Sequence, residues 1–143
     1  MKALSIVGYL GLVAGLVGLL ATKSLLSPLP VVIALQLVAL MLLIWARFTF
    51  GRRSFHVAAN PTAGGLVTTG PYRFIRHPIY TAICLFVTAG AAAHLSLSSV
   101  LLCTLIWATC LTRMLCEERL LRGMYPEYGK YAAATSRMIP FVF

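Results

Sequence analysis

Long uncharged stretches alternate with short basic segments along the 143 residues of the chain. Residues 3–22 and 24–46 carry no formal charge, and neither do residues 78–112. The last stretch is too long for a single crossing of about 20 residues, and its polar positions 94–99 predict a tight turn between two helices. The pattern predicts an all-α, polytopic membrane protein. Its four expected transmembrane helices cover roughly residues 3–21, 29–47, 78–93 and 98–115.

Composition supports a membrane location. The chain is 60% hydrophobic and only 10% charged, whereas soluble domains usually carry about 25% charged residues. A chain of this length forms one compact unit and cannot bury so much apolar surface as a soluble domain. We therefore expect a single integral membrane domain over residues 1–143. Residues 1–47 would provide the first two helices, and residues 48–143 would form the core that carries the chemistry.

Basic residues predict the orientation of the chain in the membrane. The net charge is +9, and eleven of the twelve Lys and Arg side chains fall at the N-terminus, in residues 47–76 or after residue 112. Only Lys23 would lie on the other side. The positive-inside rule then places both termini in the cytoplasm, and we expect a prokaryotic inner membrane. Membrane lipids with anionic headgroups account for this charge, so no nucleic-acid partner is expected.

Glycines recur along the first expected helix, at positions 8, 11, 15 and 18. They share one face, and such a face allows two helices to approach closely. We expect this face to pack against another helix of the same chain; dimerisation is the alternative.

The segment Gly70–Tyr80 is the first polar cluster between the apolar stretches. It contains Arg73, Arg76 and His77, and it places Pro78 where proline suits the first position of a helix. Free backbone donors at that helix start would favour an anionic group. Lipid phosphates are an alternative partner for the two arginines.

The second polar cluster, Arg113–Glu118, holds two of the three acidic residues of the chain. Arg113 and Glu117 have the i,i+4 spacing of a helical ion pair, as have Glu118 and Arg122. Surplus arginine in the same region could instead satisfy one carboxylate and leave the other free for a cationic ligand. Charged groups this close to hydrocarbon are functional candidates, and the spacing alone leaves both interpretations open.

A turn signal, Asn60–Gly65, precedes the first polar cluster. Gly64 and Gly65 allow a ligand to approach the backbone closely, although a plain turn explains them equally well. Leu66 and Val67 are apolar enough to flank a flat ring. The four cysteines form no CxxC pair, and we expect neither a metal site nor a disulfide.

Several motifs follow one another through the second half of the chain. Their order is Leu66-Val67-Thr68-Thr69-Gly70-Pro71-Tyr72, Arg76-His77-Pro78-Ile79-Tyr80, Arg113 with Glu117-Glu118, then Glu127-Tyr128 and Tyr131. This order resembles the isoprenylcysteine carboxyl methyltransferase family, and the related phospholipid N-methyltransferases share the broader arrangement. The resemblance covers roughly residues 47–140. Its specific part is an RHPxY element followed by a glutamate pair at the end of a helical hairpin.

The resemblance implies a methyltransferase that uses S-adenosyl-L-methionine, is similar to carboxyl O-methyltransferases and acts on a lipophilic acceptor. The cofactor site would lie on the cytoplasmic side, in the C-terminal half. Arg113 and Glu117 would be the catalytic residues. Arg113 matches the family's substrate-contacting arginine, and Arg137 is a second candidate for the acceptor. The positions implied for cofactor binding are Gly65, Leu66, Val67, Tyr72, His77, Pro78, Ile79, Tyr80, Glu117 and Glu118.

The chain departs from the family pattern in two places. Thr81 and Ala82 follow the RHPxY tyrosine, where family members often have glycine. The usual FGxxY element near the C-terminus takes the shorter form Tyr125-Pro126-Glu127-Tyr128. Both departures lie where the acceptor would enter, so its chemistry stays open between a carboxylate, a thiol and an amine.

Two other functions remain open from the sequence. An NADPH-dependent membrane reductase of the sterol or enone type has a similar C-terminal layout, including a closing element like Ile139-Pro140-Phe141. A small four-helix transporter would be expected to carry an acidic residue within a span, and the first two expected spans have none. Binding of S-adenosylhomocysteine or of NADPH to the purified protein discriminates between the enzymes.

Overall fold

A computed structural model of the chain describes residues 2–51 and 65–140, and in these residues the fold is helical. An isolated bridge between Ile75 and Ser136 is the only β-type pairing in the described part. The predicted all-α class is therefore confirmed. The α-helices are α1 (Lys2–Ala21), α2 (Pro30–Phe50), α3 (Pro78–Ala93), α4 (Leu97–Met124) and α5 (Tyr128–Ala134), and a short 3₁₀ helix, η2, covers Gly70–Arg73.

Three of these helices, α1, α2 and α4, are long and apolar enough to cross a membrane. Helix α3 is apolar but has only 16 residues. At 1.5 Å per residue it extends about 24 Å, which is shorter than the hydrocarbon core of about 30 Å. Length and composition thus confirm three of the four predicted spans, and the fourth is a shorter apolar helix packed beside them.

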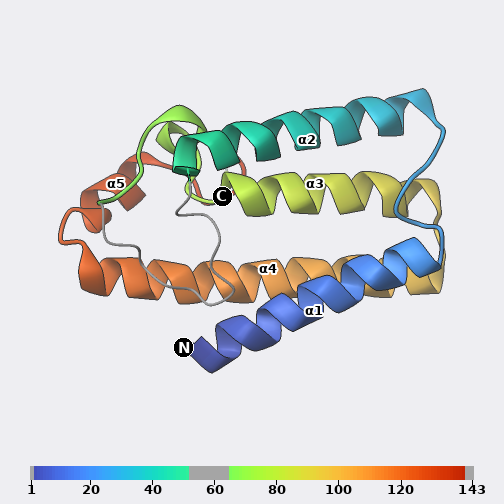
Figure 1. The fold of residues 1–143 in the computed structure, drawn as a ribbon, viewed down its shortest axis with the longest axis horizontal. Coiled ribbons are helices and arrows are strands. Elements are labelled where there is room, and N and C mark those ends of the chain that lie inside the picture. The colour runs from blue at the N-terminus through green and yellow to red at the C-terminus, as the bar shows by residue number, and fades with distance from the viewer. Residues whose placement is uncertain (1, 52–64, 141–143) are drawn as a thin grey trace.

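The helices lie in the order α2, α3, α4 across the bundle, and α1 crosses α4 obliquely (Figure 1). The glycine face of α1 makes this crossing close. A Cβ atom on Gly11 would lie 2.6 Å from the Thr109 side chain, and one on Gly15 would lie 2.5 Å from Ile106. Any larger residue would separate the helices. The face therefore packs within the monomer, as expected from the sequence.

The predicted turn at residues 94–99 is present between α3 and α4. Ser96 is the N-cap of α4, and its side chain accepts a hydrogen bond from the Ser99 backbone N–H at 3.1 Å. The Ser99 hydroxyl in turn accepts one from the Ser96 backbone N–H at 3.0 Å, which completes a capping box. The turn sends α4 back along α3, toward the first polar cluster.

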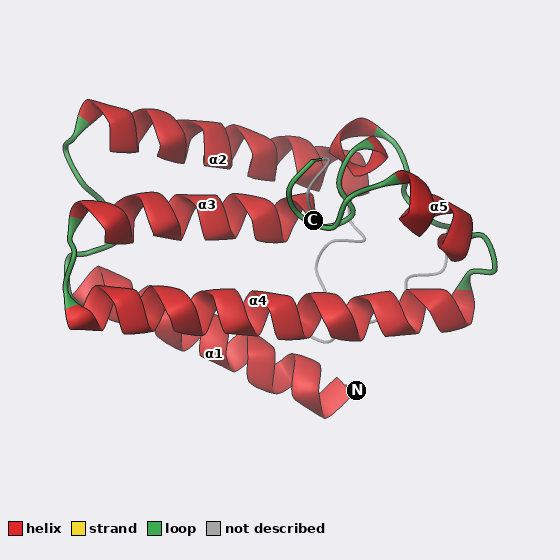
Figure 2. Cartoon of the chain, turned by 180° about the vertical axis from the view of Figure 1, so that it is seen from behind, coloured by secondary structure: helices red, strands yellow, loops and turns green. Residues whose placement is uncertain are grey.

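This topology gathers the polar clusters at one end of the bundle. The end of α2, η2, the start of α3, the last turns of α4 and α5 all lie at that end (Figure 2). Helix α4 runs on to Met124, nine residues beyond the predicted limit of its span. Its last turns therefore present Arg113, Glu117 and Glu118 to the segment that begins α3.

Candidate active site

The segment from Phe74 to His77 is held in place by the C-terminal tail. The Arg76 and His77 amides donate to the carbonyl groups of Ser136 and Arg137, at 2.8 and 3.0 Å, and Ser136 N–H donates to Phe74 O at 3.2 Å. Pro78 then begins α3 and leaves His77 at its N-cap. The C-terminal tail therefore lies against the RHPxY element.

Glu117 is the central acidic group of the site. The Tyr80 hydroxyl donates to its Oε1 atom at 2.5 Å. Arg113 Nη2 lies 3.9 Å from the same oxygen, and His77 Nδ1 lies 3.8 Å from Oε2. The Glu117 side chain nevertheless keeps 28% of its surface exposed. This carboxylate is oriented by three neighbours and is still open to a ligand.

Arg113 is buried and ties the acidic site to α1. Its Nε donates to the Tyr80 hydroxyl at 3.1 Å, and its Nη1 donates to the backbone carbonyl of Ser5 at 2.8 Å. The guanidinium carbon also lies 5.5 Å from the ring centroid of Tyr9. These contacts place a fixed positive charge beside Glu117 and give α1 a part in the site.

Glu118 occupies a different environment from Glu117. Its side chain is only 5% exposed, and its Oε1 atom accepts a hydrogen bond from Arg76 Nε at 3.0 Å. Arg137 Nε donates to Oε2 at 3.4 Å. The alternative i,i+4 partner, Arg122, instead lies over the ring of Tyr128, 5.5 Å from its centroid. Glu118 is thus engaged by arginines from distant parts of the chain.

His77 lies between the two glutamates. Its Nε2 atom is 3.4 Å from Glu118 Oε1, within ion-pair distance, but in the described part of the chain it has no partner in hydrogen-bond geometry. The ring stacks on Tyr80 with 5.8 Å between centroids. The structure therefore brings together His77, Tyr80, Arg113, Glu117 and Glu118, all of them among the predicted site residues.

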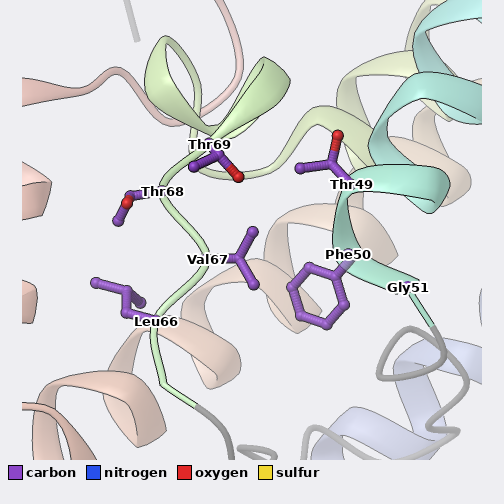
Figure 3. A pocket seen from close by; sticks show the side chains of 7 residues that line it. All are labelled: Thr49, Phe50, Gly51, Leu66, Val67, Thr68 and Thr69. Carbon is purple, nitrogen blue, oxygen red and sulfur yellow. The ribbon is translucent and has the colours of Figure 1, made fainter.

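An open pocket of about 460 Å³ lies between the end of α2 and residues 66–69 (Figure 3). Leu66 and Val67, both predicted to contact the cofactor, form one wall, and Gly65 precedes them with a φ of 84°. The opposite wall is formed by Phe50 and its neighbours from the end of α2. The full lining is Thr49, Phe50, Gly51, Leu66, Val67, Thr68 and Thr69.

The wall from α2 was not predicted from the sequence. The second helix was expected to stop near residue 47, but it continues to Phe50 and ends at Gly51, which has a φ of 66°. An aromatic residue directly before glycine was the available signal for this helix end. Of the turn predicted over residues 60–65, only Gly65 lies within the described residues.

Tyr72 lies against the pocket wall formed by α2. Its ring lies 5.5 Å from that of Phe50, between centroids, and Tyr131 donates a hydrogen bond to its backbone carbonyl at 2.7 Å. Burial raises the pKa of Tyr72 above its ordinary value, and the nearby Tyr131 and Glu117 act in the same direction. The Tyr72 hydroxyl is therefore neutral and lies within electrostatic reach of Glu117.

Tyr128 is the most buried aromatic residue of this region. Its hydroxyl has no hydrogen-bond partner among the described residues. Burial, together with the negative charge of Glu118, raises the pKa of Tyr128 to about 12. It is a neutral donor on the inner side of the Glu118 cluster.

The remaining predicted residues have less direct positions. Pro78 is buried at the first position of α3, and Ile79 is half-buried in the same turn. The Arg137 side chain is 34% exposed, so it reaches both Glu118 and the surface. Within residues 2–51 and 65–140, no three His, Cys, Asp or Glu side chains are grouped so as to hold a metal ion.

Comparison with known proteins identifies two similarities. The phospholipid methyltransferase family model matches residues 31–128 of the chain. Over 76 residues the chain is 33% identical to the cobalt-zinc-cadmium resistance protein CzcN of Cupriavidus metallidurans. That alignment covers 52% of this chain and 35% of CzcN, so the chain spans about a third of the length of this curated relative.

Proposed function

This chain belongs to the phospholipid methyltransferase family, which is related to the isoprenylcysteine carboxyl methyltransferases, and we propose that it uses S-adenosyl-L-methionine to methylate a lipophilic acceptor. The family and the apolar helices make it an integral membrane protein and a methyltransferase. The comparisons give no support to a reductase or a transporter. The identity of the cofactor, the class of acceptor and the roles of individual residues are what we propose.

The observation that supports the proposal is that an apolar pocket and the partly exposed carboxylate of Glu117 belong to elements at the same end of the bundle (Figure 2). S-adenosyl-L-methionine has a flat adenine ring at one end and a cationic amino acid at the other. The pocket offers apolar walls from Phe50, Leu66 and Val67, the Tyr72 ring lies against Phe50, and Glu117 offers a partly exposed carboxylate. An apolar cleft with a few convergent polar groups is the usual form of a cofactor site. The residues present therefore fit this cofactor.

Each group has a defined role in the proposal. Phe50, Leu66 and Val67 would flank the adenine, and Glu117 would bind the ammonium group in a charge-assisted hydrogen bond. Tyr80 and Arg113 hold Glu117 in one orientation for this purpose. When bound, the cofactor supplies a methyl group on a sulfonium. The remaining task of the protein is to hold the acceptor in line with that methyl group, which contributes several kcal/mol by orientation alone.

The acceptor would approach from the membrane. A carboxylate needs no general base, and Arg113 or Arg137 could orient it through a guanidinium group. A thiol or an amine would have to lose a proton, for which His77 is the nearest candidate base. In the orientation given by the positive-inside rule, the cofactor would enter from the cytoplasm and a lipid-like acceptor from between the helices.

Calorimetric titration of the detergent-purified protein tests the cofactor. S-adenosylhomocysteine should bind with micromolar affinity, roughly −7 to −8 kcal/mol. NADPH should give no binding signal under the same conditions. Saturable NADPH binding without S-adenosylhomocysteine binding would reverse the proposal in favour of a reductase.

Glu117→Gln tests the residue on which the proposal depends. The variant keeps an oxygen for Tyr80 but removes the charge that would face the ammonium group. We expect S-adenosylhomocysteine to bind more weakly by about 1–3 kcal/mol. Lys23→Gln, at the other end of the bundle, is the matched control and should leave affinity unchanged. Equal affinity in Glu117→Gln and the parent would make Glu117 only the ion-pair partner of Arg113.

A further inference from the structure

Glu117 and Glu118 are adjacent in the chain but differ in side-chain exposure and in the groups that contact their carboxylates. Glu117 is 28% exposed, whereas Glu118 is 5% exposed and both of its oxygens are occupied. Oε1 lies 3.0 Å from Arg76 Nε and 3.4 Å from His77 Nε2, and Oε2 lies 3.4 Å from Arg137 Nε. These partners satisfy the Glu118 carboxylate without any ligand.

Arg76 extends this contact to the C-terminal tail. Its Nη1 donates to the backbone carbonyl of Ala132 at 2.8 Å and also to the backbone carbonyl of Thr135. The same nitrogen lies 3.3 Å from the Thr135 hydroxyl. One buried guanidinium therefore joins the last turns of α4, the segment before α3, and the end of α5 with the tail that follows it.

Two further contacts fasten the same tail. Its backbone pairs with the segment from Phe74 to His77, and the Thr81 hydroxyl donates to the carbonyl of Met138 at 2.9 Å. The tail thus covers the segment that supplies His77, and His77 in turn contacts Glu117.

We propose that Glu118 is a positioning residue: its charge holds Arg76 and Arg137, and through them it fixes the tail of residues 132–138 on the RHPxY segment. It acts on methyl transfer through His77 and Arg137 and makes no contact with the cofactor. The effect on catalysis rests on the proposed function, whereas the fastening of the tail does not.

The physical reason is the cost of an uncompensated buried charge. Without the carboxylate, the Arg76 guanidinium has no counterion in its place, and it gains solvation by leaving the tail carbonyl groups. The shared hydrogen bonds between tail and segment then open more often, while the apolar packing of α1 to α4 is untouched. The expected consequence is local opening at the site.

Hydrogen exchange of the full-length protein in detergent measures this opening at defined amides. Arg76, His77 and Ser136 are the amides that join segment and tail. In Glu118→Gln they should exchange at least about tenfold faster than in the parent, and by a larger factor than the amides of α1 or α2. Glu117→Gln is the matched control and should leave these amides unchanged. Glu118→Asp keeps the charge and should restore most of the protection.

Titration with S-adenosylhomocysteine on the same proteins completes the test. We expect Glu118→Gln to lose less affinity than Glu117→Gln, and Glu118→Asp to recover the parental value. Unchanged exchange together with a loss of affinity equal to that of Glu117→Gln would overturn the proposal and make Glu118 a ligand contact. Exchange accelerated by the same factor in the helices as in the tail would also overturn it, because the role would then be global.

Two results separate this proposal from the proposed function. If the parent binds no S-adenosylhomocysteine, the proposed function fails, and the exchange measurement still decides the role of Glu118. If Glu118→Gln does not fold, Arg76→Lys provides the second variant, because lysine cannot bridge Glu118 and the two carbonyl groups at once. Unchanged tail exchange in Arg76→Lys would then overturn the proposal.

Discussion

At the end of the bundle where Lys23 lies, the side chains of Gln36 and His94 contact main-chain carbonyl groups, whereas at the opposite end charged side chains also contact one another. Gln36 donates to the carbonyl groups of Leu25 and Phe86 at 2.7 and 3.3 Å, and His94 Nε2 contacts Leu26 O at 2.8 Å. These contacts fix a connecting loop against α3. They satisfy main-chain carbonyl groups of the loop.

At the end of the bundle that carries the candidate site, folding costs more free energy because charged side chains are buried there. Burying a charge is expensive unless it is paired, and an apolar replacement for a buried ion pair is often equally stable. Glu118, Arg76 and Arg113 are all buried there, yet Glu117 remains partly exposed in their midst. Stability alone does not require this arrangement. We infer that the charges at this end orient the Glu117 carboxylate and hold the C-terminal tail.

The largest effect is expected from Arg76→Ala. It leaves Glu118 as a buried carboxylate without its shortest ion-pair contact, and removing one partner of such a pair costs about 3–5 kcal/mol. Thermal unfolding in detergent can be followed with a dye that reacts with the buried thiols of Cys84, Cys110 and Cys116.

Arg73→Ala is the matched control for this experiment. Arg73 is exposed and contacts only the ring of Phe74 among the interactions described for it, at 4.6 Å from the centroid. Its loss should change the free energy of unfolding by no more than about 0.5 kcal/mol. Equal destabilisation by the two variants would show that the ion cluster is not what distinguishes this end.

Gly90→Ala should have the next largest effect, at the opposite end. A Cβ atom there would collide with the backbone carbonyl of Leu25 and lie 2.7 Å from its carbon and 3.1 Å from Ser24 O. These are backbone atoms, so the loop itself has to move, at a cost of about 2 kcal/mol. The same dye assay should show a lower melting temperature with unchanged S-adenosylhomocysteine affinity.

Gly123→Ala provides the control for the loss of glycine in a helix. Gly123 lies near the end of α4, and a Cβ atom there would meet nothing within 4 Å. Alanine should stabilise that turn by up to about 1 kcal/mol. If both alanine variants are stabilised, the close approach of the loop to α3 is not what holds this end together.

Much of the architecture could be predicted because it depends on local sequence. Uncharged stretches and the turn at residues 94–99 gave the helices, and Pro78 marked the start of α3. The i,i+4 spacing of Arg113 and Glu117 also predicted a contact that exists at 3.9 Å. In each case the signal and the structure lie within one or two helical turns.

Contacts between distant segments could not be predicted in this way. Local spacing offered Arg122 as the partner of Glu118, but Arg76 and Arg137 occupy that place because the tail folds back on the start of α3. The bond from Arg113 to Ser5 O spans 108 positions and depends on where α1 crosses α4. Tertiary packing determines which distant residues become partners, and it leaves no periodic pattern in the sequence.

The smallest effect is expected from Gln36→Leu. Leucine has a similar size, so the variant removes the two hydrogen bonds and leaves little empty space. A net hydrogen bond contributes about 1 kcal/mol, and we expect a loss of that order in the dye assay, with unchanged S-adenosylhomocysteine affinity. Phe86, its contact on α3, lies about 12 Å along the helix from Pro78, at 1.5 Å per residue. Because sites this far apart act independently, the combined variant Gln36→Leu/Arg76→Ala should lose the sum of the two single losses, within about 0.5 kcal/mol. A combined loss well below that sum would show that the two ends unfold as one coupled unit. The two ends would then differ in the chemistry of their side chains but would not contribute separately to the free energy of unfolding.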